Sequence, residues 1–219
     1  MSRSCPNNPR PRPRTAFTLL ELLVVMGIMV LLIAMAGMLW RAVGGSKNKA
    51  THVVLQGATG MLTNLEVAAG LGGLPTGEVD ATAVNLEPTR QAMDRMRSIP
   101  DNRQILAQLP ASSVKASGTS VVLLDAWDNP LLLVPAEGLR NVRGSGSTWS
   151  ASTAYKTGQR VAYNGLIYTC IRPGSGDPPT DTSRWYPGVR SPGGRPFFAS
   201  AGADGNMAGG DDNLYSFEN

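Results

Sequence analysis

The side chains best suited to chemistry in this chain are carboxylates. Glu21 opens an apolar run, and the nineteen residues that follow it, 22–40, carry no charge. Asp204 and Asp211 lie seven positions apart in a glycine-rich segment near the C-terminus. The sequence has a single histidine, His52, which argues against histidine-dependent catalysis and against His-rich zinc sites. No Walker or Rossmann spacing occurs either, so we expect a protein that is not an enzyme.

Glu21 stands where a carboxylate is costly. Residues 17–40 form an apolar segment of 24 residues, which as a helix measures about 36 Å and is long enough to cross a bilayer. A charge in that medium needs an opposite charge beside it. The preceding residues, 1–16, contain arginine and proline but no acid, and this basic flank places the N-terminus in the cytoplasm. We therefore expect Glu21 to have a cationic partner.

The order of residues around Ala16 differs from that of an ordinary secretory signal. Such signals are cut after their apolar core, whereas here the small residue Ala16 precedes the core. Residues 16–21 read Ala-Phe-Thr-Leu-Leu-Glu, and this run resembles the N-terminus of type IV pilin-like proteins, which include pilins and the pseudopilins of type II secretion. The family usually has glycine where this chain has Ala16.

The resemblance implies a defined maturation and assembly route. A prepilin peptidase would cleave between Ala16 and Phe17, and the new amine of Phe17 would be methylated. Glu21 would pair with the N-terminal amine of a neighbouring subunit as subunits join into a homopolymer. Before assembly the protein would be single-pass in the inner membrane, with a cytoplasmic N-terminus and a periplasmic head. The alternative is a signal anchor in which Glu21 snorkels toward the membrane interface.

The positive charge of the chain belongs to its leader, residues 1–16. The net charge is +4 and the pI is 9.3, yet outside the leader 16 basic residues balance 16 acidic ones. We therefore expect no nucleic-acid partner. Of the two cysteines, Cys5 lies in the leader and Cys170 has no partner, so we expect no internal disulfide in the processed chain.

The rest of the chain predicts an α+β fold: a long N-terminal transmembrane helix packed on a small antiparallel sheet head, with a small all-β inserted module. Apolar spacing continues the helix past the membrane, with an interruption at Gly44-Gly45. Two further helices are expected near 90–97 and 103–109, and strands at 121–124 and 131–134. The expected organisation is a leader at 1–16, a transmembrane helix at 17–40, an amphipathic continuation at 41–74, a head at 75–143, an inserted module at 144–194 and a C-terminal part of the head at 195–219.

A turn with unusual composition lies between the two expected strands. Residues 125–130 read Asp-Ala-Trp-Asp-Asn-Pro, which resembles the D-x-W-G-x-P segment of major pseudopilins. Asp128 stands where the family has glycine, and Asp tolerates the left-handed conformation that such a turn needs. A generic hairpin turn is an equally good interpretation of this piece alone.

The acidic glycine-rich segment near the C-terminus resembles the calcium loop of type II secretion major pseudopilins. Calcium binds six to eight hard oxygen ligands from carboxylates and carbonyls. The resemblance implies the following ligands: the side chains of Asp204 and Asp211, the carbonyls of Ala201 and Asn206, and Asp212 as an extra. A solvated acidic turn without metal is the alternative.

The expected insert has a composition of its own. It carries six of the nine Trp and Tyr residues of the chain, and Tyr163-Asn164-Gly165 predicts a hairpin turn. Residues 149–186 resemble the family 5/12 chitin- and cellulose-binding modules. The resemblance gives three candidate sugar contacts: Tyr155, Trp185 and Tyr186. The usual platform aromatics are replaced at 171–173 by Ile-Arg-Pro, and a structural or adhesive decoration is the alternative to glycan binding.

Two functions follow from these resemblances. The first is a structural subunit of a type II secretion pseudopilus or a related filament. The second is a filament-borne or membrane-anchored adhesin that binds polysaccharide through the insert. Both use the same anchor, and both imply no organic cofactor. The first also implies a prepilin peptidase and other pilin or pseudopilin subunits as partners.

Overall fold

The computed structural model describes residues 19–70, 72–118 and 120–218, and within the first helix it describes side chains for 22–33 and 45–69. The leader, Ala16 and Phe17 lie outside the described residues, and so does the side chain of Glu21. The chain divides into two units, Met1–Gly44 and Gly45–Asn219. The second unit holds the sheets, the short helices and the insert.

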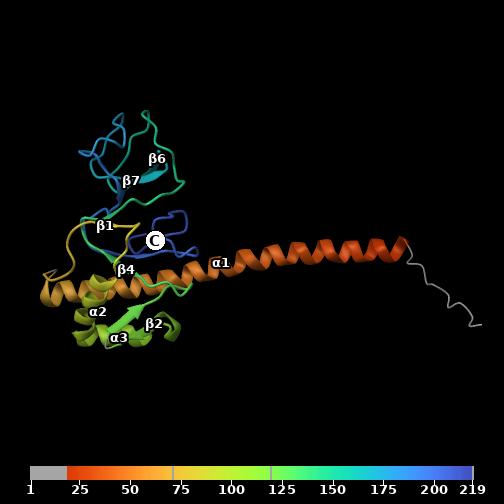
Figure 1. Ribbon diagram of the computed structural model, residues 1–219, viewed down its shortest axis with the longest axis horizontal. Coiled ribbons are helices and arrows are strands. Elements are labelled where there is room, and N and C mark those ends of the chain that lie inside the picture. Colours follow the sequence, from red (N-terminus) through yellow and green to blue (C-terminus); the bar gives the residue numbers. More distant parts are fainter. Residues whose placement is uncertain (1–18, 71, 119, 219) are drawn as a thin grey trace, which may run out of the picture. The chain divides into compact units, whose positions relative to one another are not determined.

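The long helix α1 spans Leu19–Ala69 (Figure 1). It includes Gly44 and Gly45, so the interruption expected there is not present in the backbone. The helix ends where Gly70 adopts a left-handed φ of 68° and donates its N–H to the carbonyl of Glu66 at 2.9 Å, as glycine commonly does at a helix C-terminus. The described apolar side chains of 22–33 are exposed. Among the described residues, no helical stretch combines the length and the hydropathy of a membrane span.

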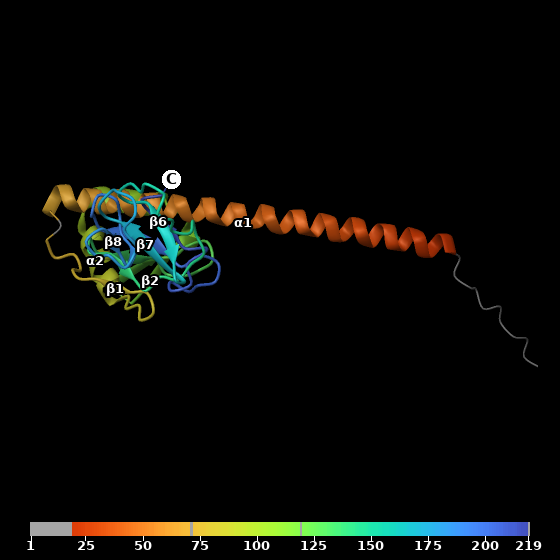
Figure 2. The same cartoon turned by 90° about the horizontal axis from the view of Figure 1, so that it is seen from above.

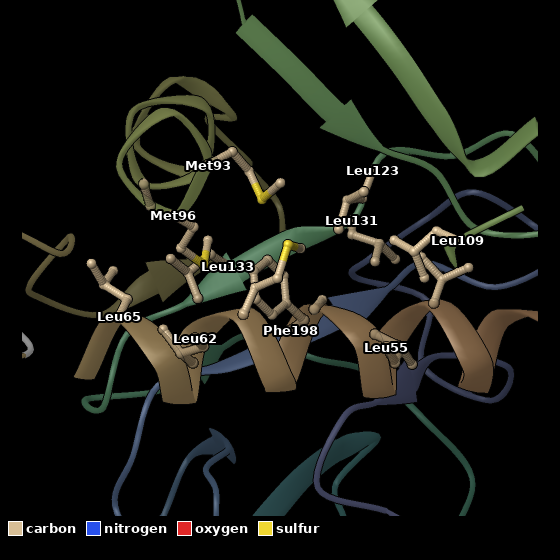
Figure 3. Close-up of a cluster of buried hydrophobic side chains, with 14 of the residues drawn as sticks. Leu55, Leu62, Leu65, Met93, Met96, Leu109, Leu123, Leu131, Leu133 and Phe198 are labelled. Atoms are coloured by element: carbon tan, nitrogen blue, oxygen red, sulfur yellow. The ribbon is translucent and has the colours of Figure 1, made fainter. Parts of the chain in front are cut away.

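The main hydrophobic core lies on one face of the C-terminal part of α1. Leu55, Leu62 and Leu65 of α1 point toward Met93 and Met96 of α2, which spans Glu87–Ser98 (Figure 3). The helix α3, Pro100–Gln108, packs against this core through Ile105 and Leu106. Its buried Asn102 donates to two backbone carbonyls, those of residues 61 and 96, at 3.0 and 2.9 Å. The core therefore fixes α2 and α3 on the helix, where periodic apolar residues had predicted them.

The head contains several small sheets rather than one. The bounds of their strands are Val79–Asp80 (β1), Val114–Ser117 (β2), Ser120–Leu123 (β3), Leu132–Val134 (β4), Leu139–Arg140 (β5), Gly188–Val189 (β9), Phe197–Ser200 (β10) and Leu214–Tyr215 (β11), and a 3-10 turn spans Ala111–Ser113. One sheet has the antiparallel order β11-β10-β4, β2 and β3 form a hairpin, and a third sheet has the order β1-β5-β9. In that third sheet β1 is parallel to β5, so the head is not wholly antiparallel as expected.

The insert is all-β, as predicted. Its strands are Arg160–Tyr163 (β6), Leu166–Cys170 (β7) and Trp185–Tyr186 (β8), paired antiparallel in the order β6-β7-β8. The turn residues Asn164 and Gly165 have φ of 50° and 77°, which is the left-handed geometry that an Asn-Gly hairpin requires. Figure 1 shows the β6–β7 hairpin and α3 at opposite ends of the second unit, and Figure 2 views the hairpin from above.

The insert begins and ends next to two paired strands of the head, β5 and β9. Leu139 pairs with Val189, and Arg140 pairs with Gly188, across the antiparallel strands β5 and β9. The pairing is close, because a Cβ added to Gly188 would lie 2.0 Å from the carbonyl oxygen of Leu139. The two ends of the insert are therefore fastened to each other through the head's own sheet.

Candidate functional site

The turn after β3 is organised by one buried carboxylate. Asp125 is only 3% exposed. Its Oδ1 accepts the backbone N–H groups of Trp127 and Asn129, both at 2.9 Å, and its Oδ2 accepts the hydroxyl of Ser200 at 2.7 Å. Asp128 adopts a φ of 68°, so the left-handed position predicted from the sequence is confirmed. Asp125 thus connects the turn to β10.

The same turn positions the glycine-rich acidic segment 200–213, which we call the acidic loop. The side-chain amide of Asn129 donates to the carbonyl of Gly202 at 2.7 Å, and the N–H of Gly202 donates to Ser200 Oγ at 3.1 Å. On the other side, the N–H of Ala126 donates to the hydroxyl of Thr51 on α1 at 3.1 Å. The turn therefore links the start of the acidic loop to α1 through hydrogen bonds on both of its sides.

Within the acidic loop, Asp204 and Asp212 are neighbours. Asp212 Oδ2 accepts the backbone N–H of Asp204 at 2.9 Å, and Asp204 Oδ1 accepts the N–H of Asn206 at 2.7 Å. Asn206 Oδ1 in turn accepts the N–H of Ala208 at 3.1 Å. Ala201, whose carbonyl was a predicted ligand, lies in the buried start of the loop. Among the described residues, the other oxygens of Asp204 and Asp212 accept no hydrogen bond.

Asp211 forms its hydrogen bonds outside the acidic loop, with Ser145. Its Oδ1 accepts the backbone N–H of Ser145 at 2.7 Å, and its Oδ2 accepts the hydroxyl of Ser145 at 2.8 Å. These two hydrogen bonds, the backbone one first, hold the pKa of Asp211 below its ordinary value. Ser145 lies in the segment that leads into the insert. Asp211 therefore joins the acidic loop to the insert.

The backbone of the acidic loop just before Asp211 also contacts the segment that leads into the insert. Arg143 donates its N–H to the carbonyl of Ala208 at 2.9 Å and forms a parallel bridge with Gly209. The approach is so close that a Cβ on Gly210 would lie 1.8 Å from the carbonyl oxygen of Arg143. The close approach of Arg143 therefore explains why glycine stands at position 210.

These contacts test the fit of a calcium ion. In the described part of the chain, no three acidic, His or Cys side chains come together around one point, so Asp204, Asp211 and Asp212 do not share a single metal position. Asp204 and Asp212 do share the loop, each with an oxygen left over. Two carboxylate oxygens and nearby carbonyls match the hard-oxygen chemistry of calcium. The residues therefore fit a site built on Asp204 and Asp212, and Asp211 lies outside it.

The β6–β7 hairpin of the insert has two distinct faces, which follow from its register. Val161 pairs with Tyr168 and Tyr163 pairs with Leu166, while Arg160 pairs with Thr169. Because side chains alternate along a strand, Val161, Tyr163 and Tyr168 share one face and Arg160 and Thr169 share the other. On the first face Val161 lies in the insert's own core while Tyr163 and Tyr168 stay half-buried, and the second face packs on the head.

The insert's own core is aromatic. Val161, Cys170, Tyr155 and Trp185 form its buried cluster. The rings of Tyr155 and Trp185 meet edge to face, with centroids 5.1 Å apart. The hydroxyl of Tyr155 accepts the N–H of Ser150 at 2.8 Å. The thiol of Cys170 is free and buried, donates to a backbone carbonyl, and has a raised pKa because burial disfavours the thiolate.

The three predicted sugar contacts are therefore misplaced. Tyr155, Trp185 and Tyr186 are 8%, 3% and 6% exposed. A domain this small needs its large aromatics to bury enough apolar area, and the same residue types that build a sugar platform here build the core. Tyr186 packs against Gly138, where a Cβ would lie 2.8 Å from its ring. Its hydroxyl is buried and has no hydrogen-bond partner among the described residues, and burial raises its pKa.

Three other aromatics of the insert keep access to solvent. Trp149, Tyr163 and Tyr168 are half-buried. Trp149 meets Tyr163 with centroids 5.8 Å apart at 84°, and Tyr163 meets Tyr168 at 6.2 Å and 77°. We call these three side chains the aromatic row. Sequence reasoning passed over them, although strand alternation from the Asn-Gly turn already places Tyr163 and Tyr168 on one face.

The opposite face of the hairpin holds the insert on the head. Thr169 donates its hydroxyl to the carbonyl of Gly188 at 2.7 Å. Arg160 forms an ion pair with Glu218 and lies over the ring of Tyr215, 5.0 Å from its centroid. Burial lowers the pKa of Arg160, and the nearby carboxylate keeps the guanidinium charge compensated. Ile167 packs against the second core cluster of the head.

Comparison with known proteins identifies two segments of the chain. A family model for the prokaryotic N-terminal methylation motif matches residues 11–37. A family model for carbohydrate-binding module family 5/12 matches residues 148–187. The chain joins a pilin-type methylation motif to a carbohydrate-binding module. No curated protein and no solved structure matches the chain.

The two matches enclose most of the residues singled out above. The methylation motif contains Ala16, Phe17 and Glu21. The carbohydrate-binding module contains the aromatic row as well as Tyr155, Trp185 and Tyr186. The acidic loop lies outside both matches, so only its geometry bears on its role. The methylation motif supports a type IV pilin-like subunit, and the module points to polysaccharide.

Proposed function

We propose that the chain is a non-catalytic, pilin-like subunit of a type II secretion pseudopilus or a related filament. The methylation motif at 11–37 is the observation that supports this most directly. In this proposal a prepilin peptidase cleaves between Ala16 and Phe17 and the amine of Phe17 is methylated. The subunit waits in the inner membrane with its head in the periplasm. Assembly then joins it to other subunits.

Glu21 supplies the electrostatic step of assembly in this proposal. Its carboxylate pairs with the methylated amine of Phe17 on a neighbouring copy. An ion pair is strong in an apolar medium, and a lone charge there is penalised. The described residues 22–33 are apolar and exposed along α1, which suits a helix that packs among other helices or lipids.

Mass spectrometry of the mature protein tests this function. The expected N-terminal residue is a methylated Phe17. Glu21→Ala should enter the membrane normally but give few filaments, and Glu21→Asp should assemble better than Glu21→Ala because it keeps the charge. A mature chain that begins elsewhere, or normal filaments from Glu21→Ala, would contradict the proposal.

The carbohydrate-binding module favours a second activity of the same subunit, the binding of polysaccharide at the cell surface. The family match at 148–187 supports it. The test is retention of the full chain on chitin and on cellulose. A chain that washes off both materials, and that ignores their soluble oligomers, would remove this activity and leave the filament role standing.

We also propose that the acidic loop holds calcium through Asp204 and Asp212. Calcium would supply charge neutralisation between the two carboxylates when bound. The chain's own part is to keep both carboxylates in one loop, which Asn129 and Ser200 do by holding Gly202. The carbonyls of Ala201 and Asn206 remain the predicted backbone ligands.

A further inference from the structure

The three half-buried aromatics of the aromatic row follow one another across the module's sheet. Tyr163 is on β6 and Tyr168 is on β7, two positions apart in the register and therefore on the same face. Trp149 lies beside β6, because its N–H donates to the carbonyl of Ala162 at 3.2 Å. The aromatic row therefore crosses the backbone of three adjacent segments, as a binding surface for an extended chain would.

We propose that this aromatic row binds a single, separated chain of a neutral polysaccharide. The proposal rests on the polysaccharide-binding activity proposed above and assigns it to a surface. The apolar C–H face of a pyranose packs on aromatic rings, and its hydroxyls need hydrogen-bond partners. The three side chains of the row carry no charge, so they match a neutral sugar rather than an acidic one.

The phenolic hydroxyls distinguish this surface from the module's other tyrosines. Among the described residues, neither Tyr163 nor Tyr168 uses its hydroxyl in a hydrogen bond, and neither hydroxyl is buried. By contrast, the hydroxyl of Tyr155 is occupied by Ser150, and that of Tyr186 is buried. Only the row offers ring surface together with free hydroxyls that a sugar can reach.

Ring orientation decides which physical form of polysaccharide fits. Adjacent rings of the row stand at 84° and 77° to each other, so no two neighbours share a plane. The flat face of a crystalline polysaccharide lies on one plane and cannot contact both rings of such a pair face-on. A separated chain can turn between residues and present different faces to successive rings. The row therefore favours soluble or amorphous chains over crystals.

Calorimetric titration of the detergent-solubilised full chain tests the assignment. The probes are soluble β-linked oligomers of N-acetylglucosamine and of glucose. Tyr163→Phe and Tyr168→Phe keep the rings and remove the hydroxyls, so each should raise Kd about fivefold, the equivalent of one ordinary hydrogen bond. Tyr186→Phe is the matched control, because it removes a hydroxyl that no ligand can reach. It should leave Kd unchanged.

The outcomes separate this inference from the function on which it rests. Retention on crystalline chitin or cellulose should be weaker than binding to the soluble oligomers. If the wild type binds an oligomer and both row variants bind equally well, the row is not the site, although the module still binds polysaccharide. Stronger binding to crystals than to oligomers would overturn the preference for separated chains. A wild type that binds no glycan in any form would overturn both the inference and the polysaccharide activity.

Discussion

Asp128, Asn141 and Asn164 have backbone φ angles of 68°, 60° and 50°, a region that residues other than glycine seldom occupy. Asp and Asn tolerate it best because their short polar side chains hydrogen-bond locally. Turn chemistry of this kind is readable from sequence, which is why the positions of Asp128 and Asn164 were predicted correctly.

Substitution of Asp128 separates backbone strain from side-chain contacts. The side chain is exposed and makes no hydrogen bond among the described residues. Asp128→Ala should lower the free energy of unfolding by about 1 kcal/mol, because alanine pays the full left-handed penalty. Asp128→Gly should be close to neutral, since it loses the strain but gains unfolded-state freedom. Chemical denaturation measures both; an alanine variant as stable as the glycine variant would contradict the strain.

The family resemblance gave three candidate sugar contacts that are buried in the structure. Tyr155, Trp185 and Tyr186 have the chemistry of a sugar platform, but burial is decided by which strand face they occupy and by how little else the module has for a core. Asp211 shows the same limit. The resemblance to a calcium loop implied that Asp211 is a metal ligand, whereas its carboxylate accepts two hydrogen bonds from Ser145, which is 66 positions away in sequence and carries no local signal.

At the scale of elements, the acidic loop is a docking element for the insert. Asp211 holds Ser145 with both oxygens, and Gly210 lies against the backbone of Arg143. Sequence could predict the elements with strong local patterns, such as α2 and the β6–β7 hairpin. It could not predict β1, β5 and β9, because strands of two residues are created by pairing with distant segments rather than by their own composition.

A methyl group at Gly210 should disrupt this docking. Gly210→Ala would place Cβ 1.8 Å from the carbonyl oxygen of Arg143, so the two backbones must separate. We expect a loss of about 2 kcal/mol or more in unfolding free energy, as for other overpacked sites. Gly146→Ala is the matched control, because its Cβ would lie 3.9 Å from the nearest atom. Equal melting temperatures for the two variants would show that the two backbones can separate at little cost in stability.

The Asp211–Ser145 contact should depend on pH. The pKa of Asp211 is lowered in the folded state by its bonds to Ser145. A group with a depressed folded pKa contributes stability above its ordinary pKa of about 4 and loses it as the pH falls through the folded value. Asp211→Asn should therefore lower the melting temperature at neutral pH, and the difference from wild type should shrink in acid. A difference that stays constant with pH would count against the carboxylate.

Calcium should stabilise the head through Asp204 and Asp212, because a ligand bound only by the folded state raises the melting temperature. The rise should vanish in Asp204→Ala and in Asp212→Ala. Asp211→Ala should be less stable throughout yet keep the calcium-dependent rise. Differential scanning calorimetry with calcium and with a chelator makes the comparison. A wild type that does not respond to calcium would rule out the metal site, and loss of the response in Asp211→Ala would place Asp211 among the ligands.

At the scale of the whole molecule, two recognisable segments share one chain with a head that neither family match covers. The α+β class and the all-β insert were readable from sequence, because helical periodicity and aromatic composition are local. The junction between insert and head was not, because it uses side chains from β6, β7 and the C-terminus together. Thr169, Arg160 and Glu218 are an example.

Removal of the module should separate the two proposed activities. Residues 141–187 can be replaced by Asn-Gly, which closes the antiparallel pair of β5 and β9 with a two-residue turn. The shortened chain should fold with a lower melting temperature, since Asp211 loses its partner and the surface under Ile167 is exposed. It should still form filaments but no longer bind polysaccharide. Electron microscopy and the oligomer titration measure the two outcomes, and failure to polymerise despite a folded head would make the module part of assembly.

The pairing of Arg140 with Gly188 has a consequence for how such a protein changes over generations. Backbone atoms of opposed residues in an antiparallel pair are only about 5 Å apart. Any compact domain whose own ends meet at that spacing can be exchanged at this point by recombination, while the helical core stays as it is. In the proposed filament, the same graft position would carry a fluorescent reporter or an antigen on every subunit.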